Sequence, residues 1–251
     1  MDDKELLKKR FLELARRSYN AGIFTFTDFL GLSELSVFEE VKRELHGIKY
    51  SFFGGHADTE RKMIRFGDPE ELLYEEPFPI VTLKAEPIAQ KFADKLSHRD
   101  ILGALMNLGL ERENFGDIAI INNVAFIFMK DSVSEYVSEY LSRARHTDLK
   151  LSLVDSLPEG ELFKTEEKSI QLSSERLDAV IAKVFNLSRE AAQALFVREL
   201  VYASGKLILS PSHCPKRDDV ISVRGHGRFI YKSYEATSRK GKLCAKVELY
   251  I

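Results

Sequence analysis

The sequence contains no tryptophan, only two cysteines among its 251 residues, and no long apolar segment. Cys214 and Cys244 form no CxxC pair, and the one histidine beside either of them is His213. Two isolated cysteines are typical of structural residues in a reducing compartment, so we expect neither a disulfide nor a metal site. No apolar run approaches the about 18 residues that a membrane-spanning helix needs.

Motifs of targeting and of catalysis are also missing. The first residues, MDDKELLKKRFLELARRS, lack the apolar core of a secretory signal, and their acidic residues are unusual in an organelle transit peptide. The sequence has no Ser/His/acid arrangement, no phosphate-binding glycine loop and no metal-ligand spacing. We therefore expect a cytoplasmic protein that is not an enzyme, needs no cofactor and does not contact a membrane.

The distribution of charge divides the chain into two parts. Residues 1–169 contain 23 Lys and Arg against 31 Asp and Glu, whereas residues 170–251 contain 14 against 8. The net charges are −8 and +6, although the whole chain carries only −2. Such asymmetry favours a polyanion-binding segment at the carboxyl-terminal end, with a charged solvated face as the plainer alternative.

Periodicity predicts an α+β fold class with three domains. Residues 1–77 form an amino-terminal α/β region, in which apolar residues recur at helical spacing near the start and over residues 33–46. Gly54 and Gly55 then separate a short strand from a second strand or short helix. Residues 78–157 read as strand, helix, strand, strand, helix, strand, a βαββαβ sandwich with both helices on one face of the sheet.

That central sandwich is RRM-like, because the same architecture is the platform of the common RNA-recognition fold, where aromatic side chains stack on bases. Phe126 and Phe128 lie two residues apart on one face of a predicted strand, as such a platform requires. The opposite face of that strand is equally apolar. Both phenylalanines are therefore candidates for base stacking and, with greater weight, for the core.

Residues 156–170 have the composition of a linker or an irregular connection, with Pro158, Gly160 and a local acidic run. The third domain, residues 170–251, begins with a helix that Ser173 or Ser174 caps and continues with a shorter helix that Ser188 caps. Strands follow, including a hairpin that turns at Ser204 and Gly205 and a terminal hairpin with a basic turn.

Residues 176–223 resemble the S-four RNA-binding domain, named after small-subunit ribosomal protein four. The features that match are Arg176, Asp178, Leu187, Ser188, Arg189, Ala192, Leu195, Gly205, Lys206, Pro211 and Asp219-Val220-Ile221. With "FFGGHADTERK", "LSHRDILGALMNLGLERENFGDI", "RGHGRF" and "SRKGK", nearly the whole chain resembles the YlmH family. The resemblance implies RNA binding without catalysis, with ribosomal RNA or tRNA as partner on the large ribosomal subunit during rescue of stalled translation.

The candidate RNA-binding residues gather at helix starts and turns of the basic domain. Ser188 and Arg189 open a helix, whose first turn presents free N–H groups and a positive dipole end to a phosphate. Arg176 opens the preceding helix, where pairing with Asp178 or Glu175 is an equally weighted alternative. The full set of candidates is Arg176, Ser188, Arg189, Gln193, Lys206, Arg224, Gly225, Gly227, Arg228, Arg239, Lys240 and Lys242.

Three positions depart from the S-four pattern. Glu199 stands where the domain usually has glycine after the second helix, Ser204 replaces an asparagine, and Arg217-Asp218 replaces a proline-glycine pair. Glu199 lacks the easy left-handed geometry of glycine, which puts about 1 kcal/mol of strain at the helix end. We expect RNA binding that is weaker or more selective than in a typical member.

Two other function classes remain open alternatives. The chain fits a protein-interaction or adaptor factor, for example in cell division, in which the acidic part docks to another protein and RNA binding is secondary. Arg176-Leu177-Asp178 also matches the catalytic aspartate motif of pseudouridine synthases. That second alternative is disfavoured, because Asp178 precedes an uninterrupted helical run where those enzymes have a loop.

Overall fold

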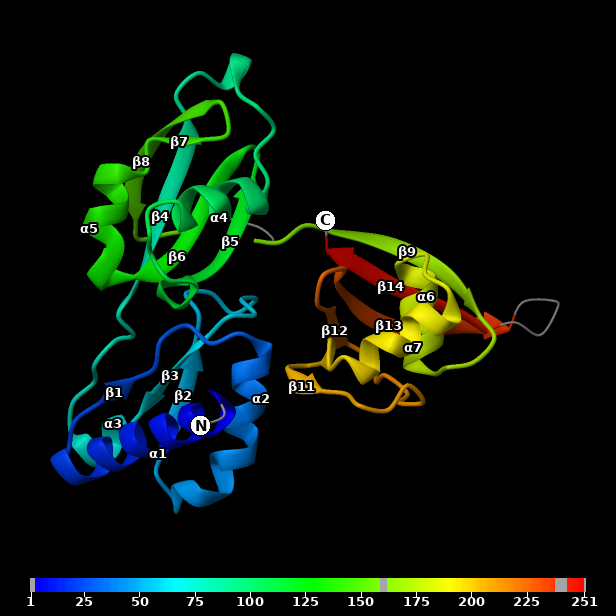
Figure 1. The fold of residues 1–251 in the computed structure, drawn as a ribbon, viewed down its shortest axis with the longest axis horizontal. Helices are drawn as coiled ribbons and strands as arrows, with labels where there is room; N and C mark the ends of the chain where they lie inside the picture. Colours follow the sequence, from blue (N-terminus) through cyan, green and yellow to red (C-terminus); the bar gives the residue numbers. More distant parts are fainter. Residues whose placement is uncertain (1–2, 159–161, 238–242, 251) are drawn as a thin grey trace. The chain divides into compact units, whose positions relative to one another are not determined.

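The computed structural model describes residues 3–158, 162–237 and 243–250 (Figure 1). The chain forms two compact units, residues 1–163 and residues 164–251. Both mix helices with antiparallel sheets, which confirms the α+β class. Within the described ranges, no helix is both long enough and apolar enough to cross a membrane. The finer division at residues 77 and 157 stays a prediction.

The amino-terminal part of the first unit packs helices against a small sheet. Its core is rich in aromatic rings, and Phe38 makes edge-to-face contacts with Phe11 and Tyr50. The three-stranded sheet has the order β1-β3-β2, with β3 buried along its whole length. The elements are α1 (Asp3–Ala21), β1 (Thr25–Phe26), α2 (Leu32–Val41), η1 (Lys42–Leu45), β2 (Tyr50–Phe53), β3 (Met63–Phe66) and α3 (Pro69–Leu72).

The βαββαβ order predicted for the centre of the chain is confirmed. The antiparallel sheet has the order β5-β6-β4-β8-β7, in which the short β7 is an addition to the predicted strands. Asn122 and Asn123 both adopt positive φ and turn the chain between β5 and β6. The elements are β4 (Ile80–Pro87), η2 (Gln90–Phe92), α4 (His98–Met106), η3 (Arg112–Asn114), β5 (Phe115–Ile121), β6 (Val124–Lys130), α5 (Asp131–Tyr140), β7 (Arg143–Ala144) and β8 (Thr147–Val154).

The two faces of this sheet are covered differently. Helices α4 and α5 pack on one face, α4 against β5 and β7 and α5 against β4 and β6, and Ile101 and Val137 belong to the apolar core between helices and sheet. On the opposite face Phe126 and Phe128 are buried against Phe29 and other residues of the amino-terminal part. Both phenylalanines are thus core residues. This was the interpretation that received the greater weight from the sequence.

Gly54 and Gly55 allow the chain to approach that buried face. Gly55 has φ +97°, and a Cβ atom there would overlap the ring of Phe128. A Cβ on Gly54 would in turn overlap the carbonyl oxygen of Arg61. Gly55 therefore lets the loop pack directly on Phe128, and Gly54 lets it approach Arg61, which explains the two glycines of "FFGG" in physical terms.

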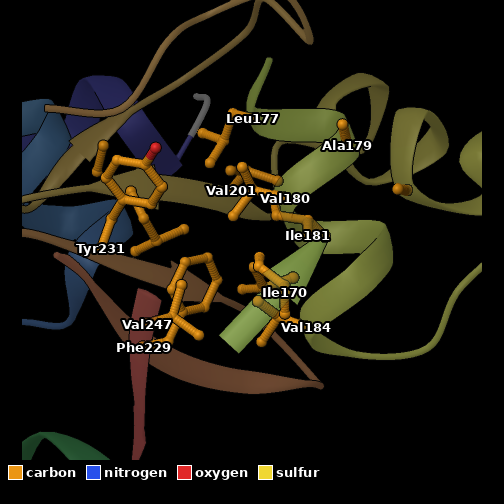
Figure 2. Close-up of a cluster of buried hydrophobic side chains, with 14 of the residues drawn as sticks. Ile170, Leu177, Ala179, Val180, Ile181, Val184, Val201, Phe229, Tyr231 and Val247 are labelled. Atoms are coloured by element: carbon orange, nitrogen blue, oxygen red, sulfur yellow. The ribbon is translucent and has the colours of Figure 1, made fainter. Parts of the chain in front are cut away.

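The second unit is a six-stranded antiparallel sheet with two helices. The sheet has the order β11-β10-β12-β13-β14-β9. Figure 2 shows Leu177, Val180, Ile181 and Val184 of α6 packed toward Phe229 and other side chains of the sheet. The elements are β9 (Thr165–Leu172), α6 (Leu177–Val184), α7 (Arg189–Val197), β10 (Val201–Ala203), β11 (Lys206–Leu207), β12 (Asp219–Val223), β13 (Gly227–Thr237) and β14 (Leu243–Tyr250).

The interpretation of residues 156–170 as a linker is wrong for its second half. Residues Thr165–Leu172 form β9, which pairs with β14 from Thr165↔Tyr250 to Leu172↔Leu243. The strand is an edge of the sheet, and only Ile170 and Leu172 are buried. Because its other side chains are mostly polar or charged, the sequence lacks the apolar alternation that marks a strand.

Candidate nucleic-acid interface

A buried carboxylate organises the start of both helices in the second unit. Asp178 is fully buried, and each of its two oxygens accepts two hydrogen bonds. Arg176 donates to Oδ1 and Oδ2 over 3.2 and 3.1 Å, and Arg189 donates from Nη2 to Oδ1 over 2.9 Å. Gln193 donates from Nε2 to Oδ2 over 2.9 Å. Arg176, Arg189 and Gln193, predicted separately as RNA contacts, are thus brought together by Asp178.

Helix α6 begins without the serine cap that the sequence predicts. Its N-cap is Arg176, which offers no side-chain acceptor. The first free N–H groups instead donate to a neighbouring loop, from Leu177 to the carbonyl of His213 over 2.7 Å and from Asp178 to that of Pro211 over 3.2 Å. Backbone carbonyls satisfy the helix start, so the cap at Ser173 or Ser174 is wrong.

Helix α7 begins as predicted. The Ser188 side chain accepts a hydrogen bond from the N–H of Ala191 over 3.0 Å, which confirms it as the N-cap. Arg189 is the first helical residue and Gln193 lies four positions later, so both side chains are on one face of the helix. That face is directed at Asp178, and this explains why one carboxylate holds both residues.

The electrostatics of the cluster favour an ionised Asp178. Burial alone raises the pKa of this carboxyl, but the hydrogen bonds from Arg176, Arg189 and Gln193 outweigh burial and lower its pKa to about 2. The same pairing raises the pKa of Arg176. At neutral pH two guanidinium cations therefore surround one carboxylate anion, and the cluster carries a net positive charge.

Both arginines keep part of their surface in contact with solvent. The side chain of Arg176 is 41% exposed and that of Arg189 is 40% exposed. A guanidinium has five N–H donors, and Asp178 takes two from Arg176 and one from Arg189. N–H donors thus remain on two side chains that Asp178 holds in place. This arrangement is suited to bidentate contact with phosphate.

A second group of predicted residues lies at the turn from β12 to β13. Arg224 donates its backbone N–H to Leu200, and its guanidinium lies 5.9 Å from the ring centre of Tyr202. Arg228 lies over the ring of Tyr250 at 4.1 Å. Gly225 and Gly227, with φ +81° and +136°, make the turn between the two arginines. Their positive φ gives these glycines a local structural role in the turn, and their role in RNA contact stays a prediction.

Lys206 begins β11 and is exposed, directly after the Ser204-Gly205 turn of the hairpin. It lies on a different element from the arginines of the helix cluster and of the β12–β13 turn. Arg239, Lys240 and Lys242 lie outside the described residues, so their predicted role stays a prediction.

The three departures from the S-four pattern all occupy left-handed backbone positions. Glu199, Ser204 and Asp218 have φ of +56°, +47° and +64°. At Glu199 the helix ends in a complete Schellman motif, with hydrogen bonds from Glu199 N–H to Phe196 and from Leu200 N–H to Leu195. The helix end keeps the geometry that glycine usually provides, and the strain falls on Glu199.

The sequence does not predict Asp178 as the centre of the cluster. Arg189 and Gln193 are 11 and 15 positions away along the chain, and only the packing of α6 on α7 brings them to it. One signal was present, because Asp178 is a charged residue among the apolar Leu177, Val180 and Ile181 of the same helix. A charge on a buried stripe indicates that its partners lie elsewhere in the fold.

Comparison with known proteins identifies the family. The family model described as "Putative RNA-binding domain in YlmH" matches residues 75–156. The protein named ribosome-associated protein quality control protein P2, from Bacillus subtilis (strain 168), is 30% identical over 224 residues, which are 86% of this chain and 83% of that protein. The chain belongs to the YlmH family.

A solved structure of this family is that titled cell division protein ylmH from Streptococcus pneumoniae. It is 19% identical, and the match covers 61% of this chain and 92% of that one with a TM-score of 0.48. The YlmH family model lies on the central βαββαβ region, whereas the predicted RNA contacts lie in the second unit. The likeness of residues 176–223 to the S-four domain stays a prediction.

Proposed function

We propose that this YlmH-family protein is a non-catalytic RNA-binding factor of translation quality control, which binds ribosomal RNA or tRNA on the large ribosomal subunit through its second unit. Two findings support an RNA or ribosome partner. The family model carries the description of an RNA-binding domain, and the Bacillus subtilis relative is named as ribosome-associated. The choice of RNA and of subunit is our proposal.

The observation that carries the proposal is the pair of arginines fixed by Asp178. Arg176 and Arg189 lie at the starts of two helices, are held by a buried carboxylate and remain two-fifths exposed. Because the two long side chains are already ordered before RNA binds, the entropic cost of binding is lower. Lys206 and Arg224 add exposed cations on two other elements of a unit with a net positive charge.

The geometry of Asp178 opposes the alternative of a pseudouridine synthase. A catalytic aspartate of that class must reach the base on which it acts. Here the carboxylate is fully buried and four hydrogen bonds from three side chains occupy its oxygens. The structure supports a role for Asp178 in placing the arginines, which is consistent with a protein that binds without catalysis.

The test is an affinity measurement on the full chain with two charges reversed, Lys206→Glu together with Arg224→Glu. Both residues lie outside the Asp178 cluster, so the helix starts stay intact. We expect the affinity for labelled tRNA and for purified large ribosomal subunits to fall about tenfold or more. We also expect the slope of log affinity against log salt to become shallower by roughly 0.7–0.9 for each lost phosphate contact.

The matched control is Arg16→Glu with Arg17→Glu, which makes the same charge change at two exposed positions of α1. If the control weakens binding as much as the test variant, only net charge matters and the proposed surface is wrong. Wild-type protein without salt-sensitive affinity for either tRNA or the large subunit overturns the proposed function itself.

A further inference from the structure

A groove lies on the helix-bearing side of the central region. It has a volume of about 540 Å³ and is lined by α4, the end of α5 and the start of β7. All of its lining residues fall within residues 75–156, the range that the RNA-binding family model matches. Its polar and aromatic lining comprises Arg99, Asp100, Asn107, Tyr140, Ser142, Arg143 and Arg145.

Positive charge is concentrated at this groove within an acidic region. Residues 75–156 contain nine Lys and Arg against thirteen Asp and Glu, yet three of their four arginines line the groove. Arg143 pairs with Asp148 over 2.8 Å and Arg145 with Asp100 over 3.7 Å, and both side chains remain more than half exposed. Arg99 is exposed and makes no ion pair with any residue that the structure describes.

Two exposed tyrosines stack at the edge of the groove. Tyr136 and Tyr140 lie one turn apart on α5, with ring centres 4.7 Å apart and an angle of 37° between the rings. They are 43% and 52% exposed, and the hydroxyl of Tyr136 donates to the carbonyl of Leu108 over 3.3 Å. The hydrogen bond fixes the ring of Tyr136, and this ring packs against that of Tyr140. An exposed aromatic surface therefore lies beside the arginines of the groove.

The usual base-stacking surface of such a sheet is closed in this protein. Phe126 and Phe128 are buried beneath the amino-terminal part, and Gly55 seals the loop onto Phe128. An RNA that binds residues 75–156 must therefore contact another surface. The groove combines the two components that single-strand binding uses, an aromatic face for a base and arginines for phosphates.

We propose that this groove binds single-stranded RNA, with an unpaired base stacked on Tyr140 and the flanking phosphates held by Arg99 and Arg143. The proposal rests on the proposed RNA-binding function and assigns it a second contact site. Single-stranded RNA fits because a base must leave its helix to lie flat on a tyrosine ring. A double helix presents only phosphates and sugars to the groove and leaves Tyr140 unused.

The test measures fluorescence anisotropy of a labelled oligouridine with the full chain. The variants are Tyr140→Leu, which keeps an apolar side chain but removes the ring, and Arg99→Ala with Arg143→Ala. Loss of one stacked base corresponds to roughly a fivefold to hundredfold fall in affinity, and we expect each variant to lie in that range. Matched controls on α1 are Tyr19→Leu and Arg16→Ala with Arg17→Ala, at exposed positions far along the chain.

A second arm separates this inference from the proposed function. The same variants are titrated with folded tRNA, which we expect to keep near wild-type affinity through Lys206 and Arg224. If wild-type protein binds neither RNA, the proposed function fails. If it binds both and the groove variants bind oligouridine as wild type does, only the groove assignment is wrong.

Crosslinking gives a readout that does not depend on the folding of any variant. Ultraviolet irradiation of wild-type protein with oligouridine, followed by mass spectrometry, should attach RNA to peptides that contain Tyr136 and Tyr140. Adducts confined to residues 164–251 would overturn the proposal. An equal loss of affinity for double-stranded RNA in the Tyr140→Leu variant would contradict base stacking.

Discussion

The guanidinium of Arg189 lies 2.9 Å from the buried carboxylate of Asp178, a residue of the preceding helix. This contact joins the start of α7 to the start of α6 and fixes an arginine that the sequence alone presents as a free phosphate contact. The stability of the second unit and the positions of Arg176 and Arg189 therefore depend on the same carboxylate.

Asp178→Asn is expected to destabilise the protein by about 3 kcal/mol, because two arginines then face an uncharged amide. Urea unfolding followed by circular dichroism measures the change. Asp218→Asn is the matched control, since Asp218 is exposed and its ion pairs with Arg217 and Lys232 lie on the surface. The control should stay within about 0.5 kcal/mol of wild type. Equal effects of the two variants would contradict the assigned role of Asp178.

The contribution of Asp178 is expected to disappear in acid. Its pKa is lowered from 3.8 to about 2 in the folded protein, so the ionised form stabilises the fold. The stabilisation, about 2 kcal/mol, is complete above about pH 5 and is lost progressively as pH falls through the folded pKa of about 2. Unfolding measured between pH 2.5 and 7 should therefore show wild type and Asp178→Asn converging at the acid end. A gap that stays constant down to pH 2.5 would contradict the lowered pKa.

Gly55→Ala is expected to cost about 2–4 kcal/mol, because the new methyl group meets the Phe128 ring and the backbone has a left-handed φ. Gly103→Ala is the control. Gly103 lies inside α4 with open space at its Cβ position, so alanine there should stabilise the helix by about 0.5–1 kcal/mol. Thermal unfolding of both variants measures the two changes in stability. A Gly55→Ala variant as stable as wild type would show that the loop does not pack tightly on Phe128.

Glu199→Gly is expected to stabilise the second unit by about 1 kcal/mol, since Glu199 has φ +56° at the C′ position of a Schellman motif. Glu190→Gly, in the first turn of the same helix, is the matched change and should destabilise by about 0.5–1 kcal/mol. Urea midpoints compare the two. A loss of stability in Glu199→Gly would mean that the glutamate side chain itself holds the helix end.

The fold was predictable wherever one period of apolar residues dominates a segment. The βαββαβ order follows because strands such as Val124–Lys130 are apolar up to their last residue and α4 has a capping serine at its start. β9 was not predictable, since its polar residues become a strand only through pairing with β14. A strand that forms only by pairing with a distant partner has little signal in its own amino-acid composition.

The sequence predicted which cationic residues belong to the candidate site. It did not predict how they are arranged in space. Ser188 and Arg189 could be placed at a helix start from local signals, and the structure confirms that placement. Their relation to Asp178 depends on how α6 packs on α7, which no local pattern encodes. The groove beside Tyr140 likewise combines residues of three elements, and no local pattern indicates that they share one surface.

The pairing of β9 with β14 also sets an order of events during synthesis. β9 is the first strand of its sheet to leave the ribosome, and β14, the last described strand along the chain, is the neighbour that it needs. Until then β9 has no place in the sheet, while residues 1–163 have every strand of their own sheets and are free to fold. The addition of β9 to its sheet is thus delayed until β14 has been synthesised.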